Sequence, residues 1–290
     1  MKEKLKLIEC PRDAMQGMKA FIPTEEKISY LNTLLKVGFD TLDFGSFVSP
    51  SAIPQLADTA LVLPKLNLDN TSTKLLAIIA NVRGAREASM FGQISFLGFP
   101  FSVSETFQKR NTNSTIEESL VTVEHALNIC EKSKKQLVVY LSMGFGNPYG
   151  EVWNSEIVMK WTEKLFGIGI KIISLADTVG VAKPTDISFL YSQLIPAFPT
   201  VEFGAHFHTR PNEWKEKIEA AYNNGCRRFD GAVKGYGGCP MATDKLTGNM
   251  PTENLVSFMV EKNIPVDIME TELPVTLMAA DNLFSKYKKH

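Results

Sequence analysis

Two histidines lie two residues apart in the segment His206-Phe207-His208, although the chain contains only four histidines. The segment ends a run of strand-forming residues, 201–208, and side chains two positions apart on a strand point to the same side. One histidine alone is more often structural, but two imidazoles together at a strand end indicate metal ligation. Imidazole suits several metals, and a carboxylate from Asp13 with an amide oxygen would favour Mg²⁺ or Mn²⁺.

A charged cluster follows the first strand-like run, where Glu9 leads through Cys10 and Pro11 to Arg12 and Asp13. In a barrel of parallel strands this cluster would stand at the end where catalytic residues gather. The alternative is a surface turn that contains a salt bridge. The residues by themselves favour neither interpretation.

Two other aspartates lie within or just after strand-like runs. Asp43 alternates with apolar residues in the run 41–47, where a buried carboxylate requires a partner. Asp177 follows the run 171–175, and it either caps the next turn or takes part in chemistry.

Cys239 follows a glycine-rich stretch, residues 235–238, with the sequence GYGG. Glycine makes a backbone flexible and closely approachable. The cysteine is therefore either incidental to a turn or a thiol that a mobile loop delivers onto bound substrate. Asn249, further along, could supply the amide oxygen of a metal site.

The elements that must position these residues are short strands that alternate with helical segments. The predicted strands are 5–9, 41–47, 75–81, 94–99, 136–143, 171–175, 201–208 and 227–233. The predicted helices include 25–37, 116–131, 156–166, 185–195 and 212–224. This alternation predicts an α/β fold, a TIM (β/α)₈ barrel with extra C-terminal helices. An open doubly wound sheet is the alternative, but no GxGxxG motif follows the first strand.

Helix boundaries carry their own signals. Gly38 and Gly225 each follow the last residue of a predicted helix. Thr24 is predicted as an N-cap, and Ser114 as another that pairs with Glu117. We expect one domain over residues 1–290. The barrel would occupy about 5–235, and a lid loop with C-terminal helices about 236–290.

Composition narrows the class of protein. The 290 residues are 44% hydrophobic and 22% charged, which excludes a disordered or fibrous chain. The 31 basic and 32 acidic residues balance, so neither a nucleic acid nor an acidic membrane surface is an expected partner. Four scattered cysteines without a CxxC pair argue against disulfides and structural zinc. With no secretory signal and no apolar run long enough to span a membrane, we expect a cytoplasmic protein.

Several motifs occur together over roughly residues 5–260. They are Pro11-Arg12-Asp13 with Gln16, GSFVSP at 45–50 with Pro54-Gln55, STIEES at 114–119, SLADTVG at 174–180, His206-Phe207-His208, GGCP at 237–240 and Gly248-Asn249. In this order they resemble the 3-hydroxy-3-methylglutaryl-CoA lyase family, whose members are metal-dependent TIM-barrel lyases. The SFVSP and GGCP motifs are specific to the lyases within a wider superfamily.

The resemblance implies a role for each matching residue. A divalent metal, Mg²⁺ or Mn²⁺, would be held by Asp13, His206, His208 and Asn249. Arg12 would contact the thioester carbonyl of the substrate and stabilise the enolate, and Cys239 would be the catalytic thiol. Asp43 and Asp177 would have catalytic or supporting roles, and Glu9 would support the metal site. Gln16 and Ser46 would bind substrate.

The implied reaction is retro-Claisen cleavage of 3-hydroxy-3-methylglutaryl-CoA to acetoacetate and acetyl-CoA. His206 or Asp13 would accept the proton of the C3 hydroxyl, and Cys239 or a metal-bound water would protonate the enolate. The family also implies a homodimer.

Departures from the family pattern keep other substrates and reactions open. Glu9 stands one residue closer to Pro11 than usual, Asp43 replaces a glutamate, and Thr209 replaces an aspartate. The segment between Cys239 and Asn249 is also longer than usual by about one residue. The alternatives are a lyase for a related 3-hydroxyacyl-CoA, a condensing synthase that makes citramalate or isopropylmalate, and a catalytically silent barrel.

Overall fold

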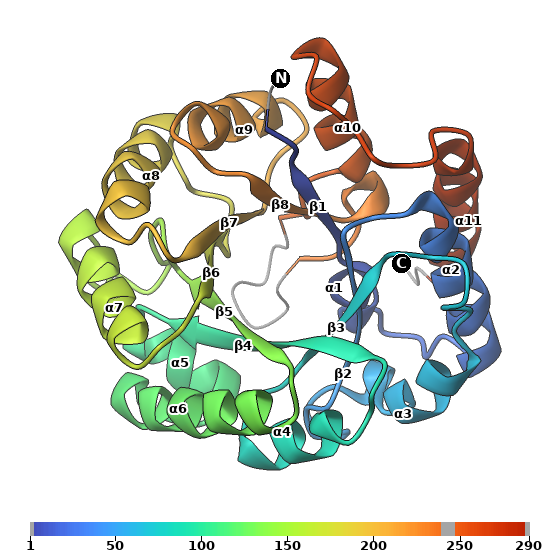
Figure 1. Ribbon diagram of the computed structural model, residues 1–290, viewed down its shortest axis with the longest axis horizontal. Helices are drawn as coiled ribbons and strands as arrows, with labels where there is room; N and C mark the ends of the chain where they lie inside the picture. Colours follow the sequence, from blue (N-terminus) through green and yellow to red (C-terminus); the bar gives the residue numbers. More distant parts are fainter. Residues whose placement is uncertain (1–2, 239–246, 288–290) are drawn as a thin grey trace.

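Eight parallel strands form a closed barrel in the computed structural model, which describes residues 3–238 and 247–287 (Figure 1). The strands are β1 (Lys6–Glu9), β2 (Thr41–Ser46), β3 (Lys74–Ile78), β4 (Ile94–Ser102), β5 (Gln136–Ser142), β6 (Ile172–Asp177), β7 (Glu202–Phe207) and β8 (Arg228–Gly231). Each strand pairs with its neighbours in chain order, and β1 closes the barrel on β8 through the pair Ile8 and Asp230. The predicted TIM barrel is confirmed.

Helices surround the barrel and cover its outer face (Figure 1). They are α1 (Pro11–Gln16), α2 (Thr24–Val37), α3 (Thr59–Val62), α4 (Val82–Ser89), α5 (Glu105–Thr112), α6 (Ile116–Lys132), α7 (Ser155–Gly167), α8 (Pro184–Ala197), α9 (Trp214–Asn223), α10 (Thr252–Glu261) and α11 (Glu272–Tyr287). The short 3₁₀ turns are η1 (Pro54–Leu56), η2 (Leu63–Lys65) and η3 (Val233–Gly235). The expected C-terminal helices are α10 and α11, and α11 packs beside α2.

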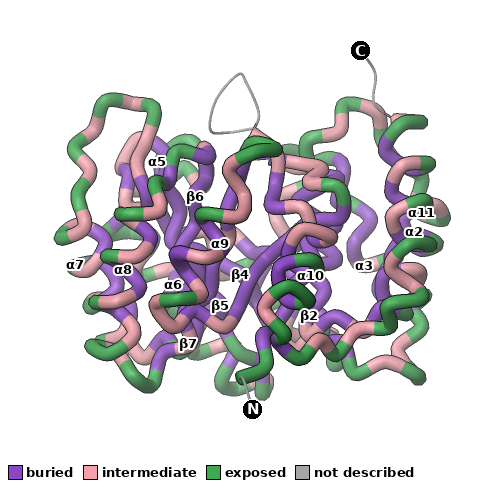
Figure 2. Tube along the Cα trace, turned by 90° about the horizontal axis from the view of Figure 1, so that it is seen from above, coloured by how far each residue is buried: buried purple, intermediate pink, exposed green. Residues whose placement is uncertain are grey.

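Apolar side chains pack on both faces of the barrel wall. The larger core lies between strands and helices and includes Leu7, Leu42 and Phe99. A smaller cluster comprises Leu76, Ile78, Phe96, Val138, Tyr140 and Ile172, which alternate with outward-facing residues on β3 to β6. Figure 2 shows the buried strands at the centre and exposed residues along the outer helices. Both layers hold the strand ends rigidly, so side chains mounted there have fixed positions.

A register shift interrupts β2 between Asp43 and Gly45. A Cβ atom at Gly45 would lie 2.5 Å from Cγ2 of Thr59 and would force the backbones apart. Glycine therefore allows β2 to bend close to α3 immediately after Asp43.

The predicted helix signals are partly correct. Gly38 and Gly225 adopt left-handed backbone angles, with φ of 81° and 96°, as expected for glycines that end helices. The predicted N-cap at Ser114 is wrong by one residue, because Thr115 has the extended backbone and forms the capping box with Glu118.

The other predicted cap is also wrong. Thr24 is already helical, and its hydroxyl donates to Asp58 rather than to the start of its own helix. Across the described residues, no helix combines the length and the apolar character that a membrane crossing requires.

Candidate functional site

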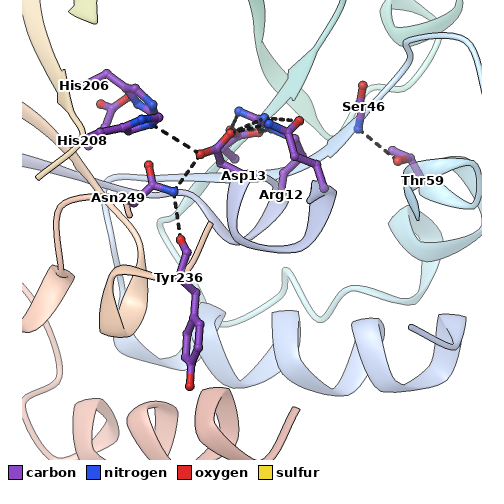
Figure 3. A network of polar contacts seen from close by, with 11 residues as sticks. Arg12, Asp13, Ser46, Thr59, His206, His208, Tyr236 and Asn249 are labelled. Atoms are coloured by element: carbon purple, nitrogen blue, oxygen red, sulfur yellow. Dashed lines mark hydrogen bonds and ion pairs between the residues drawn. The ribbon is translucent and has the colours of Figure 1, made fainter. Parts of the chain in front are cut away.

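Three of the predicted metal ligands meet at the carboxyl end of the barrel (Figure 3). Asp13 lies in the first turn of α1, directly after β1, while His206 is on β7 and His208 follows it. Each offers one ligand atom, and these atoms all lie within 4.8 Å of one another. Parallel strands bring residues that are far apart in sequence to one end of the barrel, which explains why Asp13 lies beside the two histidines.

The chemistry of His208 fits a metal ligand. Both of its ring nitrogens are buried and have no hydrogen-bond partner among residues 3–238 and 247–287. Burial and the neighbouring His206 lower the pKa of His208 to about 4, so its imidazole is neutral at physiological pH. A neutral imidazole with a free nitrogen lone pair is the form that binds metals.

Asp13 supplies negative charge to the same point. Burial opposes its ionisation, but Arg12 and the two histidines outweigh burial and lower the pKa of Asp13 to about 2. Its Oδ2 lies 3.9 Å from Nε2 of His208. A carboxylate beside a neutral imidazole forms a mixed oxygen and nitrogen site of the kind that Mn²⁺ or Mg²⁺ accepts.

Asp230 lies behind His206 and was missed by sequence reasoning. Nδ1 of His206 lies 3.1 Å from Oδ2 of Asp230, on the neighbouring strand β8. Burial opposes protonation of His206, yet the Asp230 hydrogen bond and charge raise its pKa. A carboxylate behind a ligating histidine fixes ring orientation and leaves Nε2 for the metal. The signal was present, because Asp230 is an acid inside an apolar strand, as Asp43 is.

Asn249 joins the group through its side-chain amide. Nδ2 donates to Oδ2 of Asp13 at 2.7 Å and to the carbonyl of Tyr236 at 2.9 Å (Figure 3). A Cβ atom at Gly237 would lie 2.7 Å from both Asn249 Nδ2 and the Asp13 carbonyl, and φ there is 101°. Glycine is thus required at 237 for close approach. Cys239, the predicted thiol, lies outside the described residues.

Arg12 links Asp13 to the predicted catalytic Asp43. Its Nη2 and Nε donate to Asp43 Oδ2 at 2.6 and 3.0 Å, and Nη1 donates to Asp13 Oδ1 at 2.8 Å. The expectation that Asp43 needs a partner is confirmed. Burial opposes the charge on Arg12, but Asp43 and Asp13 raise the pKa of the guanidinium above its usual value. Burial raises the pKa of Asp43 to about 6 against the opposing effect of Arg12.

Gln16 and Ser46 both face the pocket that opens beside these residues. Nε2 of Gln16 donates to Asp13, and its carbonyl oxygen accepts from Arg12. Ser46 is fixed by its backbone N–H, which donates to Thr59. The pocket lining combines polar residues with apolar ones, namely Arg12, Asp13, Gln16, Ser46, Val48, Ala52, Ile53, Ile78, Ala80, Pro100, Phe107, Asn111, Tyr140, Ser142, Ala176, Thr178, His206 and His208.

Asp177 does not line this pocket. Its two carboxylate oxygens accept from the backbone N–H groups of Val181 and Ala182, and Oδ2 also pairs with Lys217. The carboxylate therefore caps the turn after β6, which is one of the two interpretations open from sequence. Both carboxylate oxygens are engaged in these contacts, and the implied catalytic role of Asp177 stays a prediction.

Glu9 is also directed away from the metal group. It lies on β1 in phase with Leu7, which packs outward, and it accepts hydrogen bonds from Val233 N–H and the Thr252 hydroxyl. Burial raises the pKa of Glu9 to about 8. The sequence predicted that Glu9 would support the metal ligands, but its hydrogen-bond partners are Val233 and Thr252. Glu9 instead anchors the chain after β8 and the start of α10.

Comparison with known proteins agrees with this geometry. The HMGL-like family model matches residues 5–279. The chain is 34% identical to hydroxymethylglutaryl-CoA lyase YngG of Bacillus subtilis, over 85% of this chain and 81% of that protein. It is 31% identical to the cytoplasmic 3-hydroxy-3-methylglutaryl-CoA lyase of Homo sapiens, over 88% of this chain and 68% of that protein.

A solved structure resembles the whole chain. It is an HMG-CoA lyase from Acinetobacter baumannii in complex with coenzyme A and 3-methylmalate, with a TM-score of 0.90 and 29% identity. The match covers 100% of this chain and 98% of that one. The barrel, the clustered polar residues at its carboxyl end and the family match together show that this chain belongs to the HMGL-like family.

Proposed function

We propose that this protein is a metal-dependent lyase that cleaves 3-hydroxy-3-methylglutaryl-CoA to acetoacetate and acetyl-CoA. The observation that carries the proposal is the group of Asp13, His206 and His208, with buried unpartnered nitrogens on His208, beside the charged Arg12. The similarity to lyases of this activity supports the substrate, and the coenzyme A complex of the Acinetobacter enzyme supports an acyl-CoA.

The residues that would hold Mg²⁺ or Mn²⁺ are Asp13, His206, His208 and Asn249. When bound there, the metal would act as a Lewis acid that lowers the pKa of the substrate's C3 hydroxyl. Asn249 contacts the Asp13 carboxylate through its side-chain amide, which supports its place among these residues.

Arg12 stabilises the charge that develops on the thioester oxygen as the C2–C3 bond breaks. Asp43 accepts hydrogen bonds from two nitrogens of the Arg12 guanidinium. These two bonds fix the plane of the guanidinium before substrate binds. A positioned cation costs no reorganisation during the reaction. Gln16 fixes the third donor group, so the direction in which Arg12 meets the thioester is set by its neighbours.

Asp13, whose pKa is about 2, and His206, whose pKa the hydrogen bond to Asp230 raises against the effect of burial, are the two candidates to accept the C3 hydroxyl proton. Nδ1 of His206 is bonded to Asp230, so Nε2 is its accepting atom. The lone pair of Nε2 cannot ligate a metal and accept a proton at the same time. His206 would therefore serve through Nε2 either as a metal ligand or as the proton acceptor, and Asp13 is the other candidate acceptor.

We also propose a homodimer and a cytoplasmic location. The family resemblance supports the dimer. The free thiols of Cys10, Cys130 and Cys226, all buried, are consistent with a reducing compartment.

The test of the proposed function is product formation from a panel of thioesters. Purified protein with Mn²⁺ or Mg²⁺ is incubated with 3-hydroxy-3-methylglutaryl-CoA, with related 3-hydroxyacyl-CoAs, and with acetyl-CoA plus pyruvate or 2-oxoisovalerate. Acetoacetate release from the first substrate at the highest kcat/KM is expected. Preferred turnover of another thioester, or condensation of acetyl-CoA in place of cleavage, would contradict the proposal.

A further inference from the structure

A lysine is buried directly beneath the predicted metal ligands. Lys217 lies on α9 and is 2% exposed. Its Nζ donates to Oδ2 of Asp177 at 2.7 Å, to the carbonyl of His208 at 3.0 Å and to the carbonyl of Gly180 at 3.2 Å. An ammonium group has three donors, so each proton of Lys217 has an acceptor.

The three acceptors belong to two segments, which are joined only through α8 along the chain. Asp177 ends β6, Gly180 is in the turn that follows, and His208 comes directly after β7. The backbone adds a parallel link, because His208 N–H donates to the Asp177 carbonyl at 3.2 Å. Lys217 therefore joins the end of β7 to the β6 turn at the position of a predicted ligand.

The segment that carries Asn249 is attached to the same structure. Thr209 N–H donates to the Gly248 carbonyl at 2.9 Å, and the Thr247 hydroxyl donates to the Val179 carbonyl at 3.3 Å. His208 and Asn249 also form an isolated antiparallel bridge. Displacement of the β6 turn or of His208 would thus move Asn249 as well.

Stability alone gives a weak reason for this arrangement. A buried ion pair loses much of its attraction to the desolvation of both charges, and well-packed apolar residues often stabilise a fold equally well. The Lys217 side chain does not line the pocket beside Arg12, and it is not one of the grouped ligand residues. What distinguishes it is the bond to the His208 carbonyl, which fixes the backbone from which the imidazole projects.

We propose that Lys217 is a positioning residue, whose ammonium group ties the His208 carbonyl to Asp177 and so holds His208 and Asn249 in place for metal binding. The inference rests on the proposed metal site and extends it to α9. Asp177 serves in this arrangement as the counter-ion of Lys217.

The test measures Mn²⁺ affinity by electron paramagnetic resonance of free Mn²⁺, together with Tm, for the full chain and its variants. Lys217→Met is expected to raise the Mn²⁺ Kd by about tenfold, the lower end of the effect of residues that orient ligands. Because this variant leaves Asp177 buried without its counter-ion, the double variant Asp177→Asn with Lys217→Met is measured too. We expect the double variant, which has no buried charge here, to recover part of the lost Tm and to keep the weak Mn²⁺ binding.

Lys27 provides a matched control, because it is 1% exposed and pairs with the buried Asp58. It lies on α2, and Lys27→Met is expected to lower Tm without changing the Mn²⁺ Kd. If Lys217→Met and the double variant bind Mn²⁺ as tightly as wild type, or if Lys27→Met weakens binding equally, the positioning role is contradicted. If the wild-type protein binds no Mn²⁺, the metal site of the proposed function fails as well.

Discussion

At the scale of single residues, Arg12 has the most constrained geometry in the site. Nη2 of its guanidinium donates to Asp43, while Nη1 donates to both Asp13 and Gln16. A lysine would keep the charge, but it lacks the planar fork that makes these bonds together. The predicted role of Arg12 therefore depends on shape as well as charge.

Arg12→Lys should lower kcat by about a hundredfold, because loss of one preorganised donor to developing charge has an effect on that order. The Mn²⁺ Kd should change little, since the variant keeps a cation beside Asp13. Steady-state kinetics and Mn²⁺ titration of the same preparation measure both. A variant with wild-type kcat would show that Arg12 does not stabilise the transition state.

Some functional residues were visible in sequence, and others were not. His206 and His208 were visible because strand periodicity alone puts them on one side. Lys217 was not, because it lies within a helix with charged neighbours, where a solvated lysine is the ordinary expectation. Its partners come from two other elements and meet it only in the folded chain.

At the scale of elements, residues 236–238, which follow η3, lie against α1 and contact Asn249. Stacking of Tyr236 on Phe284, with ring centroids 4.3 Å apart, attaches this chain to α11. Gly237 then lets it pass against α1. The glycines at 235, 237 and 238 predicted a flexible loop from sequence. The close approach of Gly237 to α1 could not be predicted, because α1 is distant in sequence.

Gly237→Ala should weaken Mn²⁺ binding at least tenfold, because the new Cβ would displace Asn249 or the α1 backbone and φ of 101° disfavours alanine. Gly92→Ala is the matched control, since no atom lies within 4 Å of a Cβ there. Equal Mn²⁺ affinity in Gly237→Ala, Gly92→Ala and wild type would contradict this account of the loop.

Glu9 joins β1 to the chain after β8, and its raised pKa makes stability depend on pH. A carboxyl group whose pKa rises from 4.5 when unfolded to about 8 when folded binds more protons in the folded state. Its contribution is fully present below pH 4.5 and decreases as pH rises towards 8.

Glu9→Gln should therefore flatten the free energy of unfolding between pH 5 and 8, a window set by these two values. The wild-type slope in this window can reach about 1.4 kcal/mol per pH unit. Urea denaturation at several pH values measures it. An unchanged slope in Glu9→Gln would assign the pH dependence to other groups.

At the scale of the whole molecule, the alternation of strands and helices was sufficient to predict the closed barrel. Hydrophobic periodicity determines strand and helix identity, and right-handed connections leave few ways to assemble eight such units. Details that depend on single contacts were less accessible. The α6 cap lies at Thr115 because its backbone is extended, and sequence alone cannot distinguish it from the adjacent Ser114.

The barrel also explains why the site is built from distant segments. Asp13, His206 and Asn249 span most of the chain, yet the closed barrel brings them together at the carboxyl ends of its parallel strands (Figure 3). A metal at that end would join the three segments that carry Asp13, the two histidines and Asn249. Its removal should therefore abolish turnover and also lower Tm, by the linkage of binding to folding.

The most direct test of the central claim is acetoacetate release from 3-hydroxy-3-methylglutaryl-CoA before and after metal removal. Protein dialysed against EDTA is assayed alone, then with Mn²⁺ restored, beside a His208→Ala variant treated identically. The account predicts turnover that disappears with EDTA, returns with Mn²⁺, and does not return in His208→Ala. Full turnover in the chelated protein, or restored turnover in His208→Ala, would contradict it.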